Sequence, residues 1–85
     1  MPRSTSTEAY GVMVETLHEL RLREGLTQGQ LAAKIGKPQA FISNVERGAR
    51  RIDVIEFCVL ARTLNTDPVS LFAHILGRMP ADIEI

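Results

Sequence analysis

The chain has 85 residues, with ten basic and ten acidic side chains and a hydrophobic content of 45%. This length is enough for one small globular domain, and it excludes an enzyme built from two domains. The longest uninterrupted apolar run, Phe57 to Ala61, is far too short to cross a membrane, and the N-terminus lacks an apolar segment of signal-peptide length. We therefore expect a cytoplasmic protein without a membrane-spanning segment.

Side chains that bind metals or form disulfides are scarce. Cys58 is the only cysteine, and His18 and His74 are the only histidines. One cysteine cannot close an intrachain disulfide, and these three residues lack the spacing of a metal site. The sequence contains neither a nucleophile motif nor a glycine-rich phosphate loop. It predicts no metal, no cofactor and no enzymatic activity.

A first helix is expected from the N-terminal region to about Glu24. Thr5 and Glu8 have the spacing of a capping box, in which each side chain bonds to the other residue's backbone N–H. Apolar residues then recur every three or four positions, and Gly25 is expected to end the helix. Gly11 lies inside this pattern and weakens the helix by about 1 kcal/mol relative to alanine.

Two short helices separated by a tight turn are expected next. Thr27 and Gln30 form a second capping-box pattern, so a helix should cover 28–35 and end at Gly36. Pro38 suits the first turn of the following helix because its missing N–H is not needed there. Another glycine follows about ten residues later, where this third helix should end.

The rest of the chain predicts two more helices. Asp53 and Glu56 repeat the capping-box spacing for a fourth helix that ends near Leu64. The Asp-Pro pair at 67–68 opens a fifth helix, and Gly77 is expected to end it. Because only the last few residues alternate polar and apolar positions, the pattern indicates an all-α fold with five helices.

The charges are unevenly distributed although the net charge is zero. The segment from Arg21 to Arg51 holds seven basic and two acidic residues, whereas the remainder holds three basic and eight acidic residues. A positive region of this kind attracts polyanions and releases their counterions on contact. The alternative is an ordinary solvated surface whose sign bias has no function.

The segment from Leu26 to Gly48, LTQGQLAAKIGKPQAFISNVERG, resembles the lambda-repressor-like, or XRE-type, helix-turn-helix family. The resemblance extends over roughly Val14 to Leu76. It implies a five-helix lambda-repressor-like DNA-binding domain in which the second and third helices form the helix-turn-helix. The residues at the family's spacing are Thr27, Gln28, Leu31, Ala32, Gly36, Ile42, Glu46 and Gly48.

The third expected helix has two different faces. At about 100° per residue, Ile42 and Val45 fall on one side, and small or polar side chains fall on the other. A helix with such a polar edge can enter a major groove about 12 Å wide. The resemblance places base-reading residues here, and amide, hydroxyl and methyl groups have the chemistry for that contact. The expected base-reading residues are Gln39, Ala40, Ser43 and Asn44.

The resemblance also implies contacts to the DNA backbone. Such contacts position a protein on the duplex without specifying the sequence. Arg21 and Glu46 match a family pair that bridges the first and third helices, and Arg21 is expected to share a phosphate. Phe41, which stands where the family usually has a small residue, is expected to pack beside the second or fourth helix. The expected phosphate-binding residues are Arg21, Gln28, Lys37, Arg47, Arg50 and Arg51.

We divide the chain into an N-terminal tail (1–8), a helix-turn-helix DNA-binding domain (9–77, with the motif at about 27–48) and a C-terminal tail (78–85). The fifth helix and the tail carry more apolar residues than a small core needs, which predicts a homodimer contact. The alternative is that the helical members are core residues and the tail is frayed. The expected interface residues are Phe72, Ile75, Leu76, Met79 and Ile83.

These features together predict a sequence-specific DNA-binding transcriptional regulator. The expected mechanism is repression by a homodimer on a palindromic operator of double-stranded DNA. The alternative from a different class is a DNA-binding antitoxin or another module that binds a protein partner.

Overall fold

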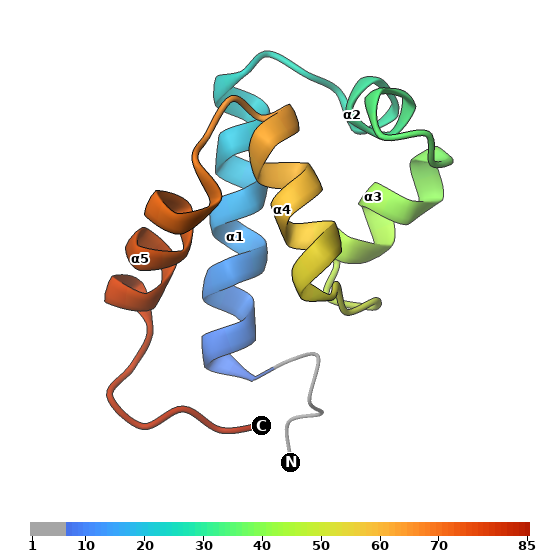
Figure 1. Ribbon diagram of the computed structural model, residues 1–85. Helices are drawn as coiled ribbons and strands as arrows, with labels where there is room; N and C mark the ends of the chain where they lie inside the picture. The colour runs from blue at the N-terminus through green and yellow to red at the C-terminus, as the bar shows by residue number, and fades with distance from the viewer. Residues whose placement is uncertain (1–6) are drawn as a thin grey trace.

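The computed structural model describes residues 7–85, which form five α-helices and no β-strand (Figure 1). The central helix α1 lies between α5 on one side and the α2–α3 pair on the other, with α4 beside it. The all-α fold with five helices is confirmed. No helix in the described part of the chain is long and apolar enough to cross a membrane. The helices are α1 (Glu8–Arg23), α2 (Gln28–Lys34), α3 (Gln39–Glu46), α4 (Val54–Thr63) and α5 (Pro68–Arg78).

Thr7 is the N-cap of the first helix, which begins at Glu8. The Thr7 backbone is extended, and its hydroxyl oxygen accepts a hydrogen bond from the Tyr10 N–H at 3.2 Å. The capping box expected for this helix involves Thr5, which lies outside the described residues. The Thr7 side chain satisfies a backbone N–H of the first turn that has no partner within the helix, so Thr7 defines the start of α1.

Two helices begin with the capping boxes that the sequence predicts. At α2, Gln30 N–H donates to the Thr27 hydroxyl at 3.1 Å, and Thr27 N–H donates to the Gln30 side chain at 2.9 Å. The same reciprocal pair joins Asp53 and Glu56 at the start of α4. Helix α3 differs because Pro38 is its N-cap and makes no side-chain cap.

The turn between α2 and α3 depends on a glycine in the left-handed region. Gly36 has φ +71°, which costs no strain without a Cβ. This conformation directs the chain back so that Lys37 N–H donates to the Ala32 carbonyl at 2.9 Å. The Ala32 carbonyl at the end of α2 is thereby satisfied, and α3 starts two residues later at a fixed angle.

The expected end of α5 is corrected by the structure. Gly77 does not stop the helix but continues it to Arg78. The helix ends because Met79 is extended, with ψ 152°, and Pro80 follows it. Proline disfavours helical backbone at the preceding residue, and glycine is permissive of helix as well as of turns.

The hydrophobic core draws on all five helices. The inner face of α3 enters it through Ile42 and Val45, which are 1% and 2% exposed. Ile75 of α5 is also 1% exposed, so the expectation that it contributes to a dimer contact is wrong. The register of α5 turns Leu71 and Ile75 inward and leaves Phe72 and Leu76 outside.

Replacing Gly36 with alanine should lower the free energy of unfolding by about 1 to 2 kcal/mol, because a Cβ is disfavoured at this φ although the surrounding space is open. Gly11→Ala is the matched control, since Gly11 is helical and a Cβ added there would also meet no atom within 4 Å. It should stabilise the protein by about 0.5 to 1 kcal/mol. Urea unfolding of both variants measures this, and equal effects of the two substitutions would contradict the role given to the turn.

Candidate nucleic-acid interface

The outward edge of α3 carries the four residues that the sequence predicts to read bases. Gln39 and Ala40 are exposed in the first turn, and Ser43 and Asn44 are half-buried one turn later. The opposite side of the helix is buried in the core. The structure therefore brings these four side chains together on one accessible edge. Because Ala40 and Ser43 are small, they project little from the helix surface.

Arg47 stands at the C-terminal end of this edge. It is exposed, and its guanidinium donates a hydrogen bond to the side-chain carbonyl of Asn44. This contact engages the amide oxygen of Asn44 and leaves its N–H₂ group on the outside. The orientation of Asn44 is thereby linked to a cation beside it.

The carboxylate of Glu46 joins three helices at the base of the interface. It accepts two hydrogen bonds from the Arg21 guanidinium, at 2.7 Å from Nε and 3.0 Å from Nη2. Gln28 Nε2 donates to the same carboxylate at 3.0 Å, and His18 Nδ1 lies 2.9 Å from it. The Arg21–Glu46 pair that the resemblance implies is thus present, as part of a larger cluster.

This cluster is largely hidden from solvent. The side chains of Arg21 and Glu46 are 8% and 9% exposed. Arg21 Nη1 also donates to the Leu26 carbonyl at 2.8 Å, so its guanidinium is committed to the protein interior. Arg21 therefore serves to pair a buried carboxylate, and its expected contact with a DNA phosphate stays a prediction.

Glu46 remains ionised at neutral pH. Burial alone raises the pKa of this carboxyl, but hydrogen bonds from Arg21, Gln28 and His18 lower it by more. The net result is a pKa below the ordinary 4.5. The charged form is the one that accepts all these hydrogen bonds, so ionisation and the assembly of the cluster support each other.

A second glutamine connects the cluster to the outward edge of α3. Gln39 Nε2 lies 3.4 Å from Gln28 Oε1 and donates to it, while Gln28 donates to Glu46. The chain of contacts therefore runs from the buried carboxylate to the first residue of α3. Gln28, which the sequence predicts to bind phosphate, is half-buried and also orients Gln39.

The loop after α3 and the turn before it present the remaining expected cations. Arg50 forms a two-pronged ion pair with Glu56, with both N–O distances at 3.0 Å, and its guanidinium lies 4.4 Å from the centre of the Phe41 ring. Lys37 lies over the same ring at 5.7 Å. Phe41 is half-buried against the core beside α4 and is not on the outward edge of α3. This agrees with the expected packing role.

Tyr10 fixes this loop from α1, and the sequence gives no sign of that role. Its hydroxyl donates to the Arg50 carbonyl at 3.3 Å and accepts the Ile52 N–H at 3.1 Å. Arg51 lies over its ring at 4.7 Å. Forty residues separate Tyr10 from the loop, so no local pattern could reveal this contact.

Replacing Glu46 with glutamine should lower the free energy of unfolding at neutral pH by about 3 kcal/mol, because Arg21 is left as a buried, uncompensated charge. The contribution of Glu46 is present above the ordinary carboxyl pKa of 4.5 and is lost as the pH falls through its lower folded-state pKa. The Glu46→Gln variant should therefore lose less unfolding free energy than the wild type when the pH falls from neutral to acidic.

Urea unfolding from neutral to acidic pH measures both effects. Glu56→Gln is the control, because it removes the charge from the more exposed pair with Arg50 and keeps a residue suited to the capping box. It should cost less than Glu46→Gln. An equal or larger loss for the control would contradict the central position given to Glu46.

Comparisons with known proteins agree with this geometry. A family model described as helix-turn-helix matches residues 17–71. The uncharacterized HTH-type transcriptional regulator y4dJ of Sinorhizobium fredii is 40% identical over 52 residues, which are 61% of this chain and 68% of that protein.

Two solved structures are similar over most of the chain. An XRE-family like protein from Pseudomonas syringae pv. tomato has a TM-score of 0.79 and 40% identity, covering 85% of this chain and 88% of that one. The restriction-modification controller protein C.AhdI from Aeromonas hydrophila has a TM-score of 0.65 and 35% identity, covering 71% and 87%. The chain belongs to the XRE-type helix-turn-helix family of DNA-binding transcriptional regulators.

Proposed function

We propose that the protein is a sequence-specific regulator that binds a palindromic operator as a homodimer and represses transcription by occupying it. The observation that carries this proposal is the outward edge of α3, which is polar, accessible and held to the body by Glu46. The similarity to C.AhdI, a restriction-modification controller protein, supports a regulatory role.

The side chains of the α3 edge match the chemistry of base pairs in the major groove. The amides of Gln39 and Asn44 can each make a paired hydrogen bond to adenine. The methyl group of Ala40 suits the thymine methyl, and the Ser43 hydroxyl can donate or accept. Two of these groups are already oriented, because Gln39 contacts Gln28 and Asn44 contacts Arg47.

Contacts to the phosphate backbone of DNA are proposed around the outward edge of α3. Gln28, Lys37, Arg47 and Arg51 lie on or beside the helix-turn-helix, and the three cations are exposed. Arg50 joins them from the same loop, although a phosphate must compete there with the carboxylate of Glu56. These contacts set the position of α3 on the duplex and add affinity for any sequence.

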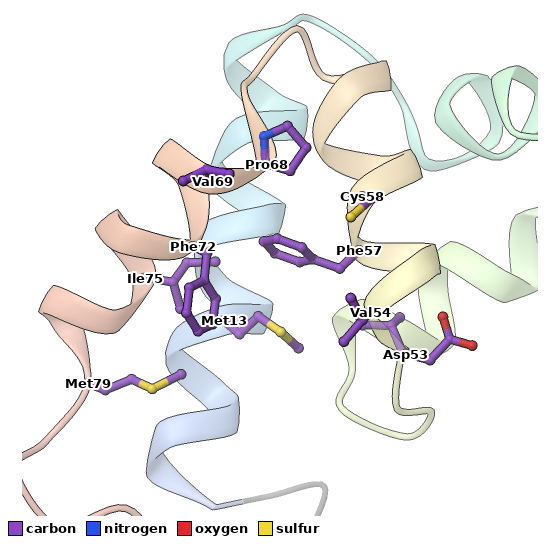
Figure 2. Close-up of a pocket in the computed structure, with 11 residues that line it drawn as sticks. Met13, Asp53, Val54, Phe57, Cys58, Pro68, Val69, Phe72, Ile75 and Met79 are labelled. Carbon is purple, nitrogen blue, oxygen red and sulfur yellow. The ribbon is translucent and has the colours of Figure 1, made fainter.

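The proposed dimer contact lies on α5 and the neighbouring groove. A groove of about 430 Å³ runs between α4 and α5, and Phe57 and Phe72 lie across it from each other (Figure 2). Val69, Phe72 and Leu76 on the outer face of α5 are 77%, 54% and 49% exposed. A second copy of the chain would remove this continuous apolar surface from water.

Two residues after the groove-lining part of α5 add apolar surface to the proposal. Met79 lines the groove, and Ile83 of the C-terminal tail is 51% exposed. We therefore assign Phe72, Leu76, Met79 and Ile83 to the dimer contact. Dimerisation is what the recognition requires, because one α3 reads only a few base pairs and two half-sites about 34 Å apart give useful specificity.

The same apolar groove supports a second candidate function, that of a DNA-binding antitoxin or another partner-binding module. In that case a different protein would cover the groove in place of a second copy. Purification of the chain from its native cells distinguishes the two, because a stoichiometric protein partner that remains bound through the purification favours the second function.

Asn44→Ala should relax the preference at one base pair of each half-site, by about 1 to 3 kcal/mol, because it removes a base contact. Lys37→Ala is the control, since the loss of a phosphate contact should weaken all sequences alike and reduce the salt slope by about one unit. Selection of bound fragments from random duplexes, followed by affinity measurements, tests both. A uniform loss for Asn44→Ala would show that it does not read bases.

Phe72→Asp combined with Leu76→Asp should convert a dimer into a folded monomer, because two charges would be buried at the contact. Both residues are about half exposed, so the substitutions leave the core intact. His74→Asp introduces a charge on the exposed opposite side of α5 and serves as the control. Sedimentation velocity gives the oligomeric state, and circular dichroism checks folding. A folded double variant that sediments as the wild type would refute this interface.

A further inference from the structure

Hydrogen bonds hold the backbone on both sides of Arg51, in the loop after α3. The Tyr10 hydroxyl donates to the carbonyl of Arg50 at 3.3 Å and accepts the N–H of Ile52 at 3.1 Å. The Arg50 guanidinium donates to the carbonyl of Arg51 itself at 2.7 Å. One side chain of α1 thus binds the residue before Arg51 and the residue after it, which fixes the place of Arg51 in the loop.

The ring of Tyr10 also contacts the Arg51 side chain. The guanidinium carbon of Arg51 lies 4.7 Å from the centre of the ring. A cation over an aromatic face is attracted by the π electrons, and this contact does not use the N–H groups at the edge of the guanidinium. Tyr10 is buried and Arg51 is exposed, so a residue of the core supports a cation at the surface. Burial raises the pKa of the Tyr10 hydroxyl, which therefore keeps the proton that it donates.

The neighbouring Arg50 contributes to the same arrangement. Its guanidinium forms the two-pronged ion pair with Glu56 of α4, with both N–O distances at 3.0 Å. The side chain that donates to the Arg51 carbonyl is therefore itself held in place by α4. The position of Arg51 depends on contacts from α1 and α4, and not on the loop alone.

We propose that Tyr10 is a positioning residue for DNA binding, which holds Arg51 in the orientation in which it contacts a phosphate. The inference rests on the proposed function, in which Arg51 is a phosphate contact. An arginine side chain loses rotamer freedom when it is immobilised in a complex, and a side chain that is already ordered loses less. Tyr10 therefore raises the affinity for DNA of any sequence, and it does so through Arg51.

The test is a double-mutant cycle on DNA affinity, measured for the full chain with a mixed-sequence duplex by fluorescence anisotropy over a salt series. Arg51→Ala should weaken binding and make the log–log salt slope shallower by about 0.9, because one phosphate contact is lost. Tyr10→Phe removes only the hydroxyl. It should weaken binding by about three- to tenfold without changing the slope, because Arg51 still reaches the phosphate but must be ordered first. In the Arg51→Ala background, Tyr10→Phe should have almost no effect.

Thr16→Val is the matched control. It removes another buried hydroxyl of α1, which donates to the Val12 carbonyl and accepts a hydrogen bond from Arg78, both outside the loop after α3. It should leave DNA affinity unchanged in both backgrounds. Urea unfolding under the binding conditions checks that each variant is folded.

The side-chain proton resonances of Arg51 in the wild type give a second measurement that needs no variant at Tyr10. The ring current of Tyr10 should shift them upfield both before and after DNA is added. Unshifted resonances in either state overturn the inference.

Equal losses of affinity from Tyr10→Phe in the two backgrounds overturn the inference, as does a folded Tyr10→Phe variant that binds like the wild type. An Arg51→Ala variant with wild-type affinity and slope also overturns it, and leaves the proposed DNA-binding function intact. Failure of the wild type to bind any duplex at low salt overturns both the inference and the proposed function.

Discussion

A carboxylate that is almost excluded from water must be paired, and Glu46 satisfies this requirement by collecting donors from two other helices. Arg21 of α1 supplies the opposite charge, and Gln28 of α2 supplies an amide. An unpaired charge at this depth would cost several kcal/mol, so α1, α2 and α3 are held in one relative position. The direction in which α3 presents its outer edge follows from this one group.

The outer edge of α3 and the outer face of α5 differ in polarity, although both helices bury an apolar side in the core. In α3, Ile42 and Val45 fill the core, and the opposite edge remains polar and small. In α5, Leu71 and Ile75 fill the core, and the outer face remains apolar. A polar edge surrounded by cations suits a polyanion, and an apolar face suits a protein surface. The fold thus separates the proposed DNA-binding edge from the proposed dimer contact.

Local signals make the helices predictable from the sequence, whereas contacts between distant segments are not. The caps at Thr27 and Asp53 involve residues three positions apart, and both form as expected. The contact between His18 and Glu46 joins residues 28 positions apart, so nothing local encodes it. The expectation for Ile75 is wrong because helical periodicity alone does not tell which apolar stripe of α5 meets the core. The expectation for Gly77 is wrong because glycine can continue a helix as well as end it.

The central claim, that α3 is held with its polar edge outward for DNA, is tested most directly by following backbone amide chemical shifts while a duplex is added at low salt. The account predicts that the largest changes cluster along α3, at the start of α2 around Gln28 and in the loop 47–51. Changes confined to α4 and α5, with the amides of α3 unaffected at saturating DNA, would contradict it.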